Sequence, residues 1–149
     1  MKRIIVVVLA FFQFSVLSFS VELKKLHETE LNVFWAEISR SVCEGDFVAY
    51  QASCHPDGVL VSGIKNTSSP LSEALARWEK EFTATKLGTM KASVQFRFSQ
   101  RFGDETTAHE TGIFLYSNTG PDGIHHLEYI HFEELLVKRD GHWQTLMEF

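Results

Sequence analysis

Acidic and imidazole side chains recur at alternate positions along one strand-like stretch near the C-terminus. Tyr129, His131 and Glu133 are spaced two residues apart, and the two-residue period of a strand places them on one face. The same alternation places Glu110 and Phe114 together on the preceding stretch. Two carboxyl groups, an imidazole and a phenol around one apolar site could transfer protons, because neighbouring carboxylates raise each other's pKa.

A simpler interpretation of these acids stays open. Glu133 and Glu134 are adjacent, so one would be partly buried and the other solvated on the opposite face. A shift of one residue in strand register exchanges the two faces. The sequence therefore does not decide which glutamate points inward.

The histidines do not form a convincing metal site. His125 and His131 fall on one strand face, whereas His126 and Glu128 fall on the other. Zinc requires three or four ligands that converge tetrahedrally. No serine lies in the glycine-flanked turn that a hydrolase nucleophile occupies. We therefore expect neither a metal nor another cofactor.

The composition is that of an acidic globular protein. The 149 residues include 14 basic and 19 acidic side chains, which gives a formal net charge of −5. Hydrophobic residues make up 44% and charged residues 22%, both ordinary values. No basic excess exists to meet phosphates, which argues against nucleic-acid binding, and the length suits a single domain.

The first twenty residues have the pattern of a secretory signal peptide. Two basic residues precede an apolar run over residues 4–12, and Ser18 and Ser20 place small residues before a cleavage site. Cleavage after Ser20 would leave a secreted or periplasmic domain over residues 21–149 that does not bind membranes. An uncleaved membrane anchor is the alternative, although the apolar run is short for a span.

Two cysteines could form a disulfide after export. Cys43 and Cys54 would close a short loop, and an oxidising compartment permits the bond. The segment between them reads as helical, however, and a straight helix would hold the two Cα atoms too far apart for bridging. Two separate thiols are therefore the alternative.

Apolar residues at helical spacing predict three helices in the first half of the chain. Their stripes are Leu31, Phe34, Trp35, Ile38 and Val42; Phe47 and Tyr50; and Leu71, Leu75, Trp78 and Phe82. Gly45 separates the first two helices, and Asp46 caps the second. Residues 66–69 read as a polar loop, and Ser69-Pro70 begins a third helix that ends near Gly88.

Strand patterns dominate the second half. After a short strand at residues 59–61, alternating residues predict strands over 91–98, 106–117, 124–138 and 143–149. Asp140-Gly141 is a strong hairpin signal. Helices followed by long antiparallel strands are typical of an α+β domain.

Three passages together resemble a known superfamily. They are Cys43 to Phe47 with the following His55 to Val61, the helix that bears Leu75 and Trp78, and the closing segment Val137 to Trp143. Their order and spacing resemble the nuclear transport factor 2-like superfamily, and within it the SnoaL-like and ketosteroid isomerase-like branches. The resemblance implies a curved antiparallel sheet packed against three helices, forming a cone with a pocket, and a homodimer.

The resemblance does not extend to steroid isomerase chemistry. The family's pattern places Ser62 at the position of its carboxylate base and Ile38 at the position of its tyrosine. Neither side chain can do that work. Only the third position, where Glu133 falls, retains an acid.

We therefore expect an exported SnoaL-like domain that binds a small apolar or carbonyl-bearing molecule in its cone. The resemblance and the stripes suggest an apolar wall of Phe34, Trp78, Phe114 and Tyr129, and a polar end of Glu133, Glu110 and His131. One alternative is a cofactor-free lyase or isomerase that uses Glu133 and His131 as an acid–base pair. The other is a dimeric interaction module with a vestigial pocket.

Overall fold

A computed structural model describes residues 27–149 of the chain. The chain divides into two compact units, residues 1–32 and 33–149. Of the first unit only residues 27–32 are described, and they are helical. The predicted signal peptide and its cleavage site after Ser20 lie outside the described residues. No helix within residues 27–149 has the length and apolar character that crossing a membrane requires.

The second unit contains the three helices that the sequence predicts. A helix covers residues 33–44, and it is followed by α2 (Phe47–Ala52) and α3 (Leu71–Lys86). Gly45 joins the first two with a positive φ of 68°. A Cβ at this position would lie 2.4 Å from the backbone nitrogen of Lys86. Only glycine therefore fits where the chain turns against the end of α3.

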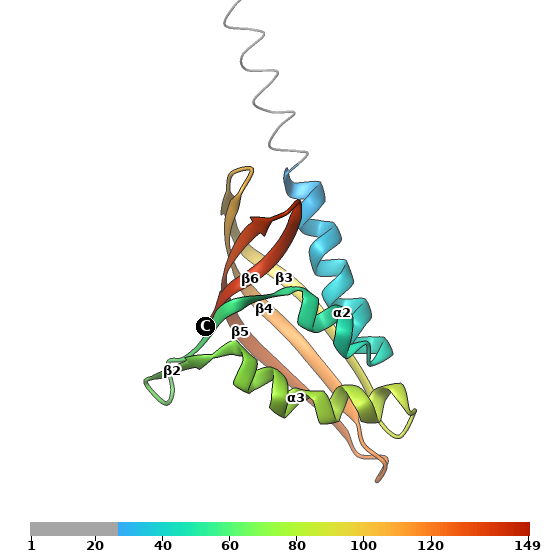
Figure 1. The fold of residues 1–149 in the computed structure, drawn as a ribbon. Coiled ribbons are helices and arrows are strands. Elements are labelled where there is room, and N and C mark those ends of the chain that lie inside the picture. The colour runs from blue at the N-terminus through green and yellow to red at the C-terminus, as the bar shows by residue number, and fades with distance from the viewer. Residues whose placement is uncertain (1–26) are drawn as a thin grey trace, which may run out of the picture. The chain divides into compact units, whose positions relative to one another are not determined.

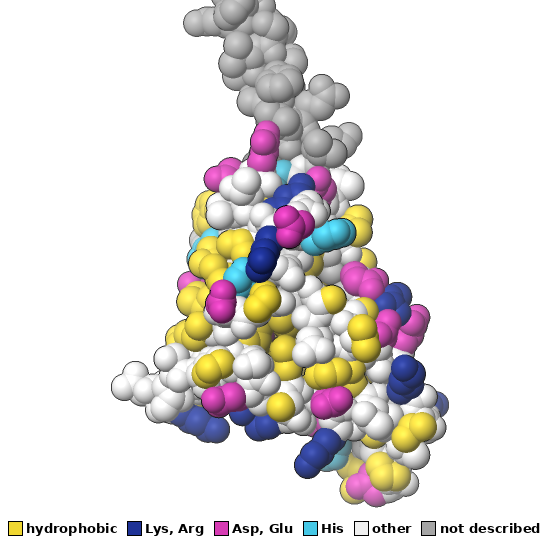
Figure 2. Space-filling model, in the orientation of Figure 1, with side chains coloured by type: hydrophobic (Ala, Val, Ile, Leu, Met, Phe, Trp, Pro, Cys, Tyr) yellow, Lys and Arg dark blue, Asp and Glu magenta, His cyan; other side chains and the backbone are white. Residues whose placement is uncertain are grey.

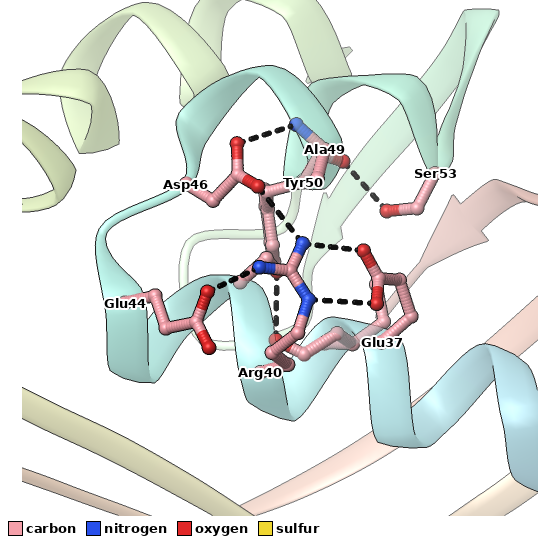
Figure 3. A network of polar contacts seen from close by, with 9 residues as sticks. Glu37, Arg40, Glu44, Asp46, Ala49, Tyr50 and Ser53 are labelled. Carbon is pink, nitrogen blue, oxygen red and sulfur yellow. Dashed lines mark hydrogen bonds and ion pairs between the residues drawn. The ribbon is translucent and has the colours of Figure 1, made fainter.

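The start of α2 is held by a polar network around Arg40 (Figure 3). The Asp46 side chain accepts a hydrogen bond from the backbone N–H of Ala49 at 3.2 Å, as its predicted role as the helix cap requires. Arg40 donates hydrogen bonds to Asp46 at 2.8 Å and to Glu37 and Glu44. These bonds lower the pKa of Asp46 below its usual value. The network fixes the entry to α2, whose Tyr50 lines the cavity described below.

Six strands form one sheet in the order β2-β1-β6-β5-β4-β3. Their bounds are Cys54–Ser62 (β1), Thr67–Pro70 (β2), Lys91–Gly103 (β3), Thr107–Thr119 (β4), His125–Arg139 (β5) and His142–Glu148 (β6). The pair β1 and β6 is parallel and the other pairs are antiparallel. The sheet is therefore mostly antiparallel, as predicted, with a single parallel pair within it. Figure 1 shows it strongly curved, with β1, β2 and β6 nearer the viewer than β3, β4 and β5.

The beginning of the sheet differs from the sequence-based expectation. Residues 67–70 form the edge strand β2 instead of a loop, since they pair with Val59 to Ser62. Pro70, which ends this strand, is also the N-cap of α3, and no side chain caps that helix. A proline is tolerated there because an edge strand does not use every N–H.

Aromatic side chains connect the first helix of this unit to the sheet. The Trp35 ring lies 4.4 Å from Phe96, 5.4 Å from Phe98 and 5.5 Å from Phe132, centroid to centroid. The packing of α3 against β1, β2 and α2 adds to the same core. In Figure 2, apolar side chains spread across the middle of the face formed by β1, β6 and α3, and many charged ones lie nearer its edges.

Candidate functional site

A cavity of about 390 Å³ lies between the helices of the second unit and the inner face of the sheet. Its walls are mostly aromatic and aliphatic, and four glutamates are its charged lining residues. The aromatic residues are Trp35, Tyr50, Trp78, Phe82, Phe96, Phe114 and Tyr116, and the glutamates are Glu81, Glu128, Glu134 and Glu148. An apolar cavity with a few convergent polar groups is typical of a small-molecule site.

Two carboxyl groups meet at the deep end of the cavity. Glu134 on β5 lies directly opposite Glu148 on β6 in the antiparallel register, which brings their Cβ atoms to about 5 Å. Glu134 is only 8% exposed, and its carboxylate accepts a hydrogen bond from the hydroxyl of Thr145 at 2.8 Å. The fold itself therefore holds the Glu134 carboxylate away from water.

A β-bulge turns Glu148 into the cavity. Leu135 pairs with Met147 and Leu136 pairs with Thr145, so Leu146 is the extra residue on β6. In a regular strand Met147 would follow Thr145 on the inner face. The extra residue shifts the alternation by one and brings Glu148 inward instead, which is how bulges redirect side chains next to functional sites.

Burial and mutual repulsion change the proton affinity of this pair. Burial raises the pKa of Glu148 from 4.5 to about 7. Burial and the nearby Glu148 carboxylate raise the pKa of Glu134 well above its usual value, although the Thr145 hydroxyl opposes the shift. Burial and the same carboxylates raise the pKa of the Tyr50 phenol. Near neutral pH the deep end therefore holds at least one proton that it can donate.

The other two glutamates lie at the exposed end of the lining. Glu128 on β5 and Glu81 on α3 are exposed, and the Tyr116 hydroxyl donates a hydrogen bond to Glu81 at 2.9 Å. Glu128 and Glu134 share a strand face six residues apart, a span of about 20 Å. The cavity is thus elongated, with carboxylates at both ends.

The structure corrects the predicted inner face of β5 by one residue. Tyr129 is 74% exposed and His131 is exposed, so both point away from the cavity. Glu133 is half-exposed and shares a hydrogen bond of 2.8 Å with His109 on the outer face. The cavity is lined instead by the even-numbered residues of the strand, including Glu134.

The remaining predicted site residues divide into two groups. Trp78 and Phe114 line the cavity as expected. Phe34 is buried beside Trp35, with ring centroids 5.3 Å apart, and does not line it. Glu110 faces inward as predicted, but it is fully buried behind the lining, where it accepts hydrogen bonds from Trp35 and Arg101. Its carboxylate is therefore committed to structure.

Reasoning from the sequence missed the deep acid pair, although one signal for Glu134 was present. The Asp140-Gly141 turn has two residues, so Lys138 pairs with Trp143. Trp143 is a core aromatic, 7% exposed. An inward Trp143 requires the even-numbered residues of β5 to face inward as well, which selects Glu134 over Glu133.

The two cysteines are separate thiols. Cys43 lies exposed on the helix over residues 33–44, and Cys54 begins β1 beside the cavity. The Cys54 thiol donates a weak hydrogen bond to the Tyr50 carbonyl at 3.6 Å, and burial raises its pKa to about 12. It is therefore protonated and unreactive in the folded protein. In the part of the chain that the structure describes, no three His, Cys, Asp or Glu residues are grouped as metal ligands.

Known structures share this fold at low sequence identity. An NTF-2-like protein of unknown function from Shewanella oneidensis superposes with a TM-score of 0.63 and 15% identity, over 81% of this chain and 95% of that one. A ketosteroid isomerase-like protein from Erwinia carotovora gives 0.55 and 18%, over 81% and 88%. A protein from Catenulispora acidiphila, in complex with S-DNPA, gives 0.63 and 20%, over 84% and 92%.

Comparison of the amino-acid sequence does not assign the chain to a family. No protein-family model matches the chain, and no curated protein matches it. The solved structures establish that the chain has the NTF-2-like α+β fold, which hosts many functions and does not by itself select one.

Proposed function

We propose that this chain, which has the NTF-2-like fold, binds a small and largely apolar organic molecule in the cavity. The observation that carries the proposal is the buried pair Glu134 and Glu148 at the closed end of an aromatic-walled cavity of about 390 Å³. The apolar body of the molecule would contact Trp78 and Phe114, and its polar end would meet the acid pair. The complex of a protein of the same fold with S-DNPA is in keeping with this role.

The proposal can be tested with a neutral fluorescent ketone, 6-propionyl-2-(dimethylamino)naphthalene. Its emission shifts to the blue in an apolar site, and its size suits the cavity. We expect saturable binding that Trp78→Ala weakens at least fivefold. Tyr129→Ala is the matched control, because this aromatic side chain lies on the outer face and should leave the affinity unchanged. Absence of saturable binding to a folded protein would overturn the proposal.

A second candidate, acid–base catalysis, is favoured by the pKa of Glu148, which lies near 7. A base with this pKa can remove a proton at neutral pH while protonated Glu134 hydrogen-bonds a developing oxyanion. The pair thereby replaces Glu133 and His131 in the isomerase hypothesis. Exchange of the α-protons of 1-naphthylacetone for deuterium, followed by NMR, tests it. Glu148→Gln should abolish any acceleration of this exchange by the protein, whereas Glu133→Gln should retain it. Equal exchange rates with and without protein would exclude acid–base catalysis.

Export and self-association remain predictions. N-terminal sequencing of protein from the host's extracytoplasmic fraction should give a chain that begins at Val21, and a chain that retains residues 1–20 would contradict cleavage. Exposed apolar residues on the outer face of β4 and β5, among them Ile113 and Leu127, are where a homodimer would form. Leu127→Glu should then convert the dimer to a monomer in light-scattering measurements, and a monomeric wild type would contradict the dimer.

A further inference from the structure

The charged side chains that line the cavity all carry the same sign. Four glutamates take part, and no lysine, arginine or histidine is among the described residues that line it. Two of the four, Glu81 and Glu128, lie at the exposed end, and Glu134 and Glu148 lie at the deep end. A molecule that moves inward therefore meets negative potential along the whole path, which concentrates cations.

Among the described residues, no basic side chain neighbours the deep pair. The titratable groups that face it are Tyr50 from α2, Cys54 from β1 and Glu110 from β4. None of them carries a positive charge, and Glu110 already forms an ion pair with Arg101. Of the remaining elements, α3 contributes Glu81, β5 contributes Glu128, and the helix over residues 33–44 contributes apolar side chains. The hydrogen bond that Glu134 accepts from the described part of the chain comes from the neutral Thr145 hydroxyl. Within residues 27–149, therefore, no basic side chain supplies a counter-charge to these two carboxylates.

The walls between the two ends suit the body of a cation. Seven aromatic rings line the cavity, including the indoles of Trp35 and Trp78. Aromatic faces attract ammonium groups, with tryptophan the strongest, and the attraction grows as water is excluded. The same rings provide apolar contact for the uncharged part of the molecule.

From these observations, and resting on the proposed function, we infer that the ligand is a small monocation: an amine or quaternary ammonium with an apolar body, whose charged nitrogen lies between Glu134 and Glu148. The bound cation supplies the counter-charge to the two carboxylates. Without a ligand a proton neutralises the pair instead, and burial, which raises the pKa of Glu148 to about 7, favours this protonated form. Binding then releases up to one proton to solvent.

The sign of the pH dependence separates a cation from a carbonyl ligand. A cation needs the carboxylate form of Glu148, so its affinity should rise about tenfold between pH 6 and pH 8. A carbonyl gains nothing from the ionisation of Glu148, which only removes a hydrogen-bond donor, so its affinity should stay level or fall over the same range. The two ligand classes thus give different slopes in the same protein.

Two probes of matched shape test the inference. In N,N-dimethyl-1-naphthylmethylamine a protonated nitrogen bears two methyl groups, and in 1-naphthylacetone a carbonyl carbon takes its place. Isothermal titration calorimetry at pH 6 and pH 8, in buffers of different ionisation enthalpy, measures both affinity and proton release. We expect the amine to bind at least tenfold more tightly than the ketone at pH 8, with proton release. Glu148→Gln should remove this preference and its pH dependence, whereas Glu133→Gln, on the outer face, should retain both.

Each other outcome has a definite meaning. If both probes bind equally, or the ketone binds more tightly, the cavity takes apolar molecules and the inference of a cation is wrong. If the amine binds but its affinity falls as the pH rises, Glu148 does not receive the charge and the inference is likewise wrong. If neither probe nor the neutral fluorophore binds to the folded protein, the proposed function itself fails.

Discussion

Replacing Glu148 by glutamine should stabilise the protein at alkaline pH and leave its stability near pH 4 unchanged. Glutamine keeps the shape of the protonated acid but cannot ionise. The folded state raises the pKa of Glu148 from 4.5 to about 7, so between these values the folded state binds more protons than the unfolded state. Stability from this group is therefore complete below pH 4.5 and is lost as the pH rises through 7.

The size of the effect follows from the two pKa values. Each pH unit across the gap from 4.5 to about 7 costs the ionised wild type about 1.4 kcal/mol, or about 3 kcal/mol in all. The free energy of unfolding of Glu148→Gln, minus that of the wild type, should thus grow from about zero at pH 4 to about 3 kcal/mol at pH 8.5.

Urea denaturation at a series of pH values measures this difference directly. Taking the difference between two proteins cancels the titration of groups that do not interact with Glu148, including Asp46 and Asp104, whose pKa values are lowered. Glu133→Gln is the control for removing a carboxyl from the outer face, where Glu133 is half-exposed, and it should not reproduce the gain in stability expected for Glu148→Gln. A difference for Glu148→Gln that does not change between pH 4 and pH 8.5 would refute the buried acid pair.

Two substitutions and one labelling experiment test the supporting structure. Gly112→Ala would place a Cβ 2.2 Å from a backbone carbonyl oxygen of β3, and we expect a loss of about 1–3 kcal/mol in thermal or urea unfolding; unchanged stability would contradict the close approach. Glu110→Gln leaves the Arg101 guanidinium without its buried carboxylate and should cost about 3–5 kcal/mol, whereas a loss below 1 kcal/mol would mean that the ion pair is solvated. Iodoacetamide at pH 8 should alkylate the exposed Cys43 and spare Cys54, whose pKa is about 12, as measured by peptide mass spectrometry. Cys54 should react once urea unfolds the chain. Equal rates of alkylation in the native protein would place Cys54 in contact with solvent.

Local chemistry explains which parts of the fold could be predicted from the sequence. The Asp46 cap and the Gly45 break depend on residues within a few positions of each other. The hairpin at Asp140 and Gly141 has positive φ angles of 52° and 80°, as a two-residue turn requires. By contrast, β2 is a strand only because it pairs with β1, and its polar sequence does not indicate that partner.

The two halves of the acid pair differ in how far the sequence determines them. The inward orientation of Glu134 follows from the alternation of side chains along β5. An inward Trp143 and a two-residue turn decide which face of β5 is buried. The inward orientation of Glu148 does not follow from alternation, since a regular strand would place Met147 on the inner face after Thr145. Glu148 points inward because β6 carries an extra residue at Leu146, and that bulge arises where one strand must pair with β5 on one side and β1 on the other. The chemistry of the cavity therefore depends on a local irregularity that becomes visible only when three strands are assembled.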